Sequence, residues 1–282
     1  MNQTTIIFVT YNSSHLLSSV LPQLNGYKTL VFDNNSVDDT VHRCQQESPN
    51  TEIIANKINI GYGRAANAAI KHINTPYAFL VNPDVSINTE QFDALEDSIK
   101  KIEGDWFYIA PNTGHAVADI VAPPTDNMKR ISHATGCALL FNVEKFLSLG
   151  GFDENIFLYY EEMDLSMRAK NKGLEMYYAE NIEFPHNSKQ SVAYSDELEA
   201  LRNWHFQWSS LYYKKKHALW GRLIEGLFKN LILSLGRQAF SNKKNSAKYQ
   251  VKRKATQAFI QGKKAFSKDG QPFNPAWNTQ KK

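Results

Sequence analysis

Strand-like and helix-like patterns alternate along the first part of the chain. Residues 4–10 (Thr-Thr-Ile-Ile-Phe-Val-Thr) are continuously apolar and β-branched, which is typical of a strand covered on both faces. Residues 29–32, 52–55 and 77–81 also read as strands, and residues 16–24 and 65–73 as helices between them. This alternation predicts βαβ units, hence an α/β fold with a mostly parallel central sheet and helices on both faces.

Polar residues directly follow three of these strands. They are Thr10-Tyr11-Asn12, Asp33-Asn34-Asn35-Ser36 and Asn82-Pro83-Asp84. Ligands bind outside the carboxyl ends of the strands in such sheets, so these residues are expected to meet at one edge. Each segment alone is also a common turn or helix start. Ser36 and Asp39 in particular are expected to form a capping box.

The middle of the chain has a weaker pattern. Residues 106–130 have no clear period and contain Pro123-Pro124, which predicts irregular structure. Beyond them, Gly136 and Ala138 would let a ligand or another chain segment approach the backbone closely.

Four carboxylates then crowd the start of a helical pattern, at Asp153, Glu161, Glu162 and Asp164. Neighbouring acids repel one another when desolvated. They therefore either sit on a solvated helix N-terminus or line a cleft that needs a base.

Composition describes an ordinary folded protein, with 282 residues, 42% hydrophobic and 21% charged. Cys44 and Cys137 follow no metal-ligand spacing and suggest no disulfide scaffold, which fits a reducing cytoplasm. The chain shows no signal-peptide pattern and no apolar run of transmembrane length.

Charge is distributed unevenly along the chain. Residues 1–205 carry 15 Lys and Arg against 26 Asp and Glu, whereas residues 206–282 carry 17 against 2. Such a basic tail favours an anionic partner, either a membrane surface or nucleic acid. No nucleic-acid recognition module is present, so the membrane is favoured.

The tail also has an amphipathic pattern. Leu223, Ile224, Leu227, Phe228, Leu231 and Leu235 form an apolar stripe, and the nearby aromatics are Trp204, Trp208, Tyr212, Tyr213 and Trp220. A cationic helix with such a face can lie in a bilayer interface. It can equally pack on the rest of the protein.

Seven segments together resemble the inverting glycosyltransferases of family 2, particularly bacterial rhamnosyltransferase-like members that build O-antigen and related cell-surface polysaccharides. They occur in the family's order, over roughly the first two-thirds of the chain: Val9-Thr10-Tyr11-Asn12, Asp33-Asn34-Asn35-Ser36, Asn59-Ile60-Gly61-Tyr62-Gly63 with Ala66-Asn67, Leu80-Val81-Asn82-Pro83-Asp84, Gly150-Gly151-Phe152-Asp153-Glu154, Tyr160-Glu161-Glu162-Met163-Asp164-Leu165, and His186.

The resemblance implies a GT-A fold, a nucleotide-diphosphate sugar donor and a divalent metal, Mg²⁺ or Mn²⁺. It implies that Asp84 and His186 bind the metal, although Asn82 replaces the first carboxylate of the family's aspartate-x-aspartate pattern. Mg²⁺ can be bound through one carboxylate when phosphates and waters complete its shell. The donor-binding residues implied are Thr10, Tyr11, Asn12, Asp33, Asn34, Asn59, Gly61, Arg64, Asn67, Asn82 and Asp84.

The resemblance places the catalytic base within the acidic stretch. The family's base position corresponds to Glu162, a glutamate where aspartate is usual, and Glu161 is the alternative. Asp164 is grouped with them and is expected to orient Arg168 four residues on. Gly136, Asp153 and Glu161 are the expected acceptor-binding residues.

The expected function is transfer of L-rhamnose from dTDP-rhamnose to a polyprenyl-diphosphate-linked saccharide. A UDP-hexose or UDP-N-acetylhexosamine donor, a sugar-nucleotide nucleotidyltransferase and an inactive membrane scaffold remain alternatives. Residues 1–203 are the expected catalytic domain, with a nucleotide-binding half to about 100 and an acceptor half after it. Residues 204–282 are the expected basic helical extension, placing the protein in the cytoplasm on the inner face of the cell membrane.

Overall fold

The predicted strands lie together in one part of a larger mixed sheet. The structure, a computed structural model, describes residues 3–115, 118–125, 128–186, 195–239, 243–267 and 269–275. Its strands are β1 (Thr4–Thr10), β2 (Thr29–Asp33), β3 (Glu52–Ala55), β4 (Tyr77–Val81), β5 (Trp106–Asn112), β6 (Ala118–Thr125), β7 (Met128–His133), β8 (Ala138–Asn142) and β9 (Glu175–Glu183).

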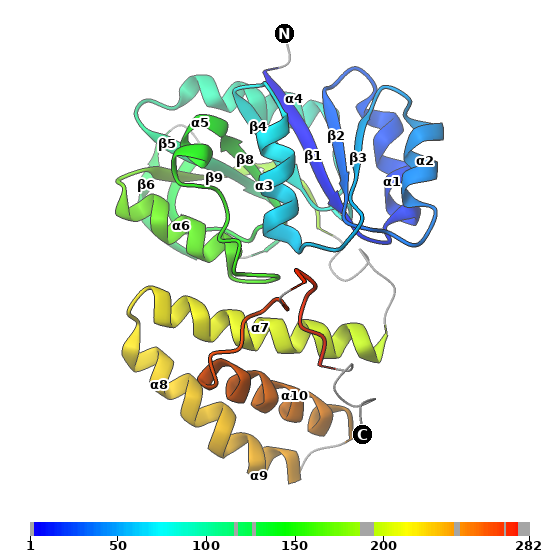
Figure 1. Cartoon of the computed structure of the whole chain (residues 1–282). Helices are drawn as coiled ribbons and strands as arrows, with labels where there is room; N and C mark the ends of the chain where they lie inside the picture. Colours follow the sequence, from blue (N-terminus) through cyan, green and yellow to red (C-terminus); the bar gives the residue numbers. More distant parts are fainter. Residues whose placement is uncertain are drawn as a thin grey trace. The chain divides into compact units, whose positions relative to one another are not determined.

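The strand order within the described residues is β3-β2-β1-β4-β8-β5-β9-β7-β6 (Figure 1). The first four strands are parallel, as predicted. β8 runs antiparallel to both β4 and β5, and β7 runs antiparallel to β6 and β9, so the second half of the sheet is mixed. The α/β fold class is confirmed, and the parallel part of the sheet is its N-terminal half.

Helices connect these strands and form the C-terminal region. They are α1 (Ser14–Val20), α2 (Thr40–Glu47), α3 (Tyr62–His72), α4 (Thr89–Ser98), α5 (Val143–Ser148), α6 (Glu161–Asn171), α7 (Asp196–Lys216), α8 (Trp220–Phe228), α9 (Ser234–Ala239) and α10 (Lys243–Ile260). Short 3₁₀ turns follow α1 (Leu21–Leu24) and α4 (Ile99–Lys101), and a π-helical turn, Lys229–Leu233, joins α8 to α9.

The chain divides into two compact units. We call residues 1–153 with 162–193 the sheet unit, and residues 154–161 with 194–282 the helical unit. The predicted boundary lay at residue 204, whereas all of α7, from Asp196, belongs to the helical unit. A short part of the acidic stretch, residues 154–161, also belongs to the helical unit.

Alternating residues of β1 build two cores in the sheet unit. Ile7 and Val9 pack in the core that also contains residues of α3, α5 and α6. Ile6 and Phe8 pack in the other core, with residues of α1 and α4. Because a strand's side chains alternate between faces, both faces of β1 are covered, which explains its unbroken apolar sequence.

The prediction of irregular structure between residues 106 and 130 is wrong. β5 and β6 lie there, and β7 begins at Met128. β6 is the last strand in the order, and its Pro123 and Pro124 are tolerated because an edge strand needs fewer ladder donors.

The predicted capping box is also wrong. Asp39 precedes α2 without a side-chain cap, and the Ser36 hydroxyl instead donates to Asp33 and accepts from the Asn12 amide.

Aromatic residues of α7 form the core of the helical unit. Trp204 stacks on Phe273 with ring centroids 4.4 Å apart, and the Trp208 indole donates to the Lys263 carbonyl at 2.9 Å. Trp204, Trp208 and Tyr213 are buried, so these three aromatics follow the alternative in which the region packs within the protein.

α8 has two different faces. Leu223 and Gly226 are buried, and the Gly226 backbone lies close to Leu211 of α7. The side chains of Trp220, Ile224, Phe228, Ile232 and Leu235 are between 54% and 66% exposed. We call these five residues the exposed stripe. Among the described residues, no helix is both long and apolar enough to cross a bilayer.

Candidate active site

The ends of β1 and β2 are joined by a buried polar network. Asp33 Oδ1 accepts from the Thr10 hydroxyl at 3.0 Å and from the Ser36 hydroxyl, and Asp33 Oδ2 accepts from the Ser36 amide at 2.9 Å. Thr10, Asp33 and Asn34 are all buried. We call Thr10, Asp33 and Ser36 the Asp33 cluster. Both carboxylate oxygens are bound within it, so the cluster fixes the geometry of the strand ends.

Asn34 and Asn12 shape the neighbouring loops. The Asn34 amide donates to Asn59 Oδ1 at 3.0 Å, and its oxygen accepts from the Ile60 amide at 2.9 Å. Asn12 has a left-handed backbone with φ of 52°, a conformation that asparagine tolerates well, and its Oδ1 accepts from the Val37 amide at 2.8 Å. The predicted strand-end residues therefore do meet at one edge, together with Gly61, whose φ is 85°.

Three further predicted donor-binding residues follow β1 or lie in α3. Tyr11 and Arg64 are partly exposed, at the end of β1 and in the first turn of α3. Asn67 is buried, and its amide donates to the Phe152 carbonyl while its oxygen accepts from the Phe152 amide. Asn67 is thus bound to the backbone of the Gly150-Gly151 loop. Its predicted contact with the donor stays a prediction.

Asp84 and His186 meet beyond β4. Asp84 is buried, and its Oδ1 lies 3.0 Å from Nε2 of His186. A β-bridge between Val85 and His186 and a hydrogen bond from the Ser86 amide to the Pro185 carbonyl hold the two segments together. One carboxylate and one imidazole side by side are suitable ligands for a divalent cation such as Mn²⁺. The residues present therefore fit the predicted metal. Asn82 lies in the same turn, and its backbone amide donates to the Cys137 carbonyl at 2.8 Å.

Glu162 lies against the backbone of Gly136. A β-carbon at Gly136 would be 3.3 Å from Cβ and 3.7 Å from Cδ of Glu162. The expected close approach to the Gly136 backbone is thus made by another chain segment, Glu162. Glu162 is half-buried, and this desolvation raises the pKa of its carboxyl, which is the direction expected for a general base.

A tyrosine and a serine hold Glu162 in place. The Tyr108 hydroxyl accepts from the Ala134 amide at 3.0 Å and lies 3.1 Å from the Ser166 hydroxyl. Ser166 in turn donates to the Glu162 carbonyl at 2.7 Å. Tyr108 and Ser166 are not among the predicted site residues, because nothing in their sequence positions indicates that β5 packs beside α6.

Asp164 is placed differently from Glu162. It is 0% exposed, and its Oδ2 accepts from Nε of Arg168 at 2.8 Å. The same guanidinium donates to the carbonyls of Leu149 and Gly151, at 2.7 and 2.6 Å. The predicted pairing with Arg168 is confirmed. Asp164 was also grouped with the catalytic residues; that assignment stays a prediction, and the structure shows this carboxylate buried against Arg168.

The remaining acidic residues flank the division between the units. Asp153 is partly exposed at the end of the first part of the sheet unit, and Glu161 is buried in the helical unit. Just before Glu161, Tyr159 and Tyr160 have φ values of 66° and 71°. Two consecutive tyrosines in this region are strained, and the Tyr160 ring packs on Phe206 and Tyr213 of α7.

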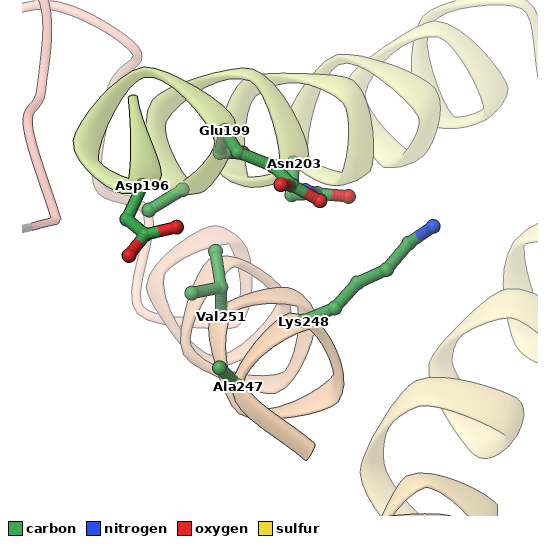
Figure 2. A pocket seen from close by; sticks show the side chains of 7 residues that line it. Asp196, Glu199, Asn203, Ala247, Lys248 and Val251 are labelled. Atoms are coloured by element: carbon green, nitrogen blue, oxygen red, sulfur yellow. The ribbon is translucent and has the colours of Figure 1, made fainter. Parts of the chain in front are cut away.

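A separate cavity lies within the helical unit. It has a volume of about 470 Å³ and is lined by residues of α7 and α10, including Asp196, Glu199, Asn203 and Lys248 (Figure 2). In the view of Figure 2, Glu199 and Asn203 project side by side from α7, with Lys248 reaching toward them from α10. None of the predicted donor- or metal-binding residues lines this cavity.

A family comparison identifies the kind of domain to which this edge of the sheet belongs. Residues 5–119 match the model of the family described as Glycosyl transferase family 2. Residues 5–119 are therefore similar to the glycosyltransferases of family 2. The matched residues include the Asp33 cluster, Asn59, Gly61 and Asp84, so a glycosyltransferase domain contains the first part of the site.

Two named proteins are similar to this chain over about two-thirds or more of its length. N-acetylglucosaminyl-diphospho-decaprenol L-rhamnosyltransferase of Mycobacterium tuberculosis is 24% identical over 265 residues, covering 77% of this chain and 86% of the relative. The low-salt glycan biosynthesis hexosyltransferase Agl10 of Haloferax volcanii is 23% identical over 210 residues, covering 66% and 68%.

Solved structures confirm the GT-A fold. A mannosyltransferase from Pyrobaculum calidifontis, in complex with GDP-Man and Mn²⁺, has a TM-score of 0.58 at 11% identity, covering 92% of this chain and 85% of that one. TarS residues 1–349 from S. aureus, in complex with UDP-GlcNAc, have a TM-score of 0.52 at 16% identity, covering 93% of each chain.

Proposed function

We propose that this glycosyltransferase moves L-rhamnose from dTDP-rhamnose to a polyprenyl-diphosphate-linked saccharide, with inversion at the anomeric carbon. The observation that carries the proposal is Glu162, a carboxyl of raised pKa held against Gly136 in the same unit as Asp84 and His186. The rhamnosyl donor and the lipid-linked acceptor are supported by the name of the mycobacterial relative.

The chemistry requires a base and a cationic site. The acceptor hydroxyl oxygen forms a bond to the anomeric carbon while the bond from that carbon to the diphosphate oxygen breaks. The hydroxyl proton passes to Glu162, and the electron pair leaves with the nucleoside diphosphate. Asp84 and His186 would hold a divalent cation, Mg²⁺ or Mn²⁺, that neutralises the charge of the leaving group. We propose that the Asp33 cluster, with Asn34, frames the nucleoside pocket.

A panel of nucleotide sugars tests the proposal. The full chain is given dTDP-rhamnose, UDP-glucose, UDP-N-acetylglucosamine or GDP-mannose, with Mg²⁺ or Mn²⁺ and a polyprenyl-diphosphate-linked N-acetylglucosamine. Labelled sugar should enter the lipid fraction from dTDP-rhamnose. Transfer from a UDP sugar alone would favour the hexosyltransferase alternative, which the Haloferax relative supports. Neither transfer nor donor hydrolysis across the panel would contradict the proposal.

We further propose that the helical unit binds an anionic membrane surface through the exposed stripe. Exposed cations, including Lys216, Arg222 and Lys229, lie close to the stripe in sequence. Apolar residues beside cations suit the interface of an anionic leaflet.

Vesicle co-sedimentation tests this membrane proposal. Ile224→Glu with Phe228→Glu should reduce binding to phosphatidylglycerol vesicles. Leu147→Glu, at an exposed leucine of α5, is the matched control and should leave binding unchanged. Equal binding by both variants would contradict the proposal.

A further inference from the structure

Two histidines and a buried cysteine from three separate segments meet beside Asp84. The ligand atoms of His115, Cys137 and His186 all lie within 4.8 Å of one another. His115 lies after β5, Cys137 just before β8 and His186 after β9. The sheet therefore brings together side chains that lie up to 71 positions apart in the sequence. Neither His115 nor Cys137 is among the site residues predicted from the sequence.

A chain of hydrogen bonds fixes the roles of the ring nitrogens. A carboxylate oxygen only accepts, so Nε2 of His186 donates its hydrogen to Asp84 across 3.0 Å. In the neutral ring, Nδ1 of His186 then accepts from Nε2 of His115, 2.7 Å away. The Nδ1 lone pair therefore points at His115. A metal ion can take the place of the proton between the two rings.

The spacing suits a tetrahedral ion. Two ligands about 2.0–2.3 Å from such an ion lie roughly 3.3–3.8 Å apart. The two imidazole nitrogens are now 2.7 Å apart, and the most distant pair of ligand atoms is within 4.8 Å. Small side-chain rotations would bring all three ligand atoms to the required separation.

The surroundings of Cys137 favour a cation. Cys137 is 2% exposed, and the Asp84 carboxylate lies 3.0 Å from Nε2 of His186 in the same group of side chains. A cation bound at the sulfur would be attracted by that carboxylate and would offset the cost of ionising a buried thiol.

We propose that His115, Cys137 and His186 bind a transition-metal ion of borderline softness, such as Zn²⁺. Two imidazoles and a thiolate suit zinc and cobalt, whereas Mg²⁺ prefers oxygen ligands. Asp84 orients His186 through its other ring nitrogen, as carboxylates commonly do for metal-bound histidines. The inference rests on the proposed function only in that both use Asp84 and His186. It implies that Zn²⁺ competes with Mg²⁺ for the His186 imidazole and the neighbouring Asp84.

Cobalt titration of the metal-free full chain tests the inference. Co²⁺ should produce a thiolate-to-cobalt charge-transfer band that saturates at one equivalent, and Zn²⁺ should abolish the band by displacement. Cys137→Ser should remove the band. Cys44→Ser is the matched control, because Cys44 is the other buried cysteine and lies in α2, and it should keep the band.

Histidine variants give a second measurement that does not depend on the core cysteine. His115→Ala should weaken Zn²⁺ binding at least as much as the roughly 10- to 100-fold expected for the orienting variant Asp84→Asn. His72→Ala, which removes a histidine paired with Glu52 on the surface, should leave binding unchanged.

Three outcomes would overturn the inference: no band in the native chain, a band retained by Cys137→Ser, or equal Zn²⁺ affinity in His115→Ala. Circular dichroism melts identify a variant that has failed to fold. Glu162→Gln separates this inference from the proposed function, since it should lose transfer and keep the cobalt band. Loss of the band in Glu162→Gln with an intact melt would also count against the site.

Discussion

The Asp33 cluster lies in the sheet unit, as do Gly136, Glu162, Asp84 and His186, which we call the corner. The cluster and the corner use their polar groups in opposite ways. In the cluster, each carboxylate oxygen of Asp33 accepts from the chain's own donors. At the corner, burial raises the pKa of Glu162, and Asp84 lies against a histidine. The oxygens of Asp33 thus serve to join the strand ends, whereas a desolvated carboxyl such as Glu162 holds its proton more tightly.

This difference predicts whether a mutation lowers stability or turnover. Removing a partner in the Asp33 cluster leaves a buried charge short of donors, so the loss should appear in the free energy of unfolding. Changing Glu162 relieves a costly burial, so the loss should appear in turnover. Variants of the two regions can therefore be told apart by measuring both stability and turnover.

The largest expected effect is on transfer. Glu162→Gln keeps the size of the side chain and removes its ability to take a proton, so turnover should fall about 10²- to 10⁴-fold. Donor binding and the melting temperature should stay near those of the native chain. Glu161→Gln is the matched control and should retain most activity. A greater loss in Glu161→Gln would move the base to the preceding residue.

The same carboxyl predicts opposite pH dependences for stability and turnover. Because burial raises the pKa of Glu162, the folded chain keeps a proton that the unfolded chain has already lost. The free energy of unfolding should therefore fall as pH rises from the ordinary glutamate pKa through the raised value. Turnover should rise over the same window, because only the ionised base accepts a proton. Denaturant unfolding at several pH values should show a flatter profile for Glu162→Gln. An identical profile would assign the titration to another group.

The clamp of Arg168 on Asp164 should dominate stability. Arg168→Ala removes the partner of a carboxylate that is 0% exposed, together with donors to the Leu149 and Gly151 carbonyls. Breaking such a pair costs about 3–5 kcal/mol. Denaturant unfolding measures the loss. Lys100→Ala, which breaks an exposed pair with Asp97, is the control and should change stability little. Equal effects would show that the clamp adds no stability.

Within the Asp33 cluster, Thr10→Val removes one donor to a buried carboxylate. The hydroxyl lies 3.0 Å from Asp33 Oδ1, and a hydrogen bond to a charged group contributes about 1.5–3 kcal/mol. Thr5→Val is the matched control in the same strand, because the Thr5 hydroxyl bonds only a neutral group, Thr75, and should cost about 1 kcal/mol. A larger loss at Thr5 would contradict the structural role given to the cluster.

The two regions also differ in how far sequence alone predicts them. The strand ends at Thr10, Asp33 and Asp84 follow from local patterns, since a buried apolar run must end where polar residues begin. The pairing of Asp164 with Arg168 follows from helical spacing. Ser36 was assigned to the wrong partner, because a hydroxyl that can cap a helix can equally bond a carboxylate.

The corner depends on contacts that no local pattern encodes. Tyr108 meets Ser166 across 58 positions, and His115 meets His186 across 71. Both contacts depend on how β5, β8 and β9 are ordered in the sheet, which includes antiparallel pairing missed by the alternation of strands and helices. The environment of Trp204 was left open for a related reason, because an apolar face predicts burial without showing whether protein or lipid covers it.

The smallest expected effect tests how tightly the corner is built. Gly136→Ala places a β-carbon 3.3 Å from Cβ of Glu162, a contact that requires α6 or the Gly136 backbone to shift by a few tenths of an ångström. Such a shift should misplace the base and reduce turnover up to about tenfold, equivalent to about 1.4 kcal/mol. Gly114→Ala is the control, because no atom lies within 4 Å of a β-carbon added at Gly114. Its φ of +76° means that this substitution also strains the local backbone. If initial rates fall in Gly114→Ala and not in Gly136→Ala, close packing of Glu162 on this backbone does not position the base.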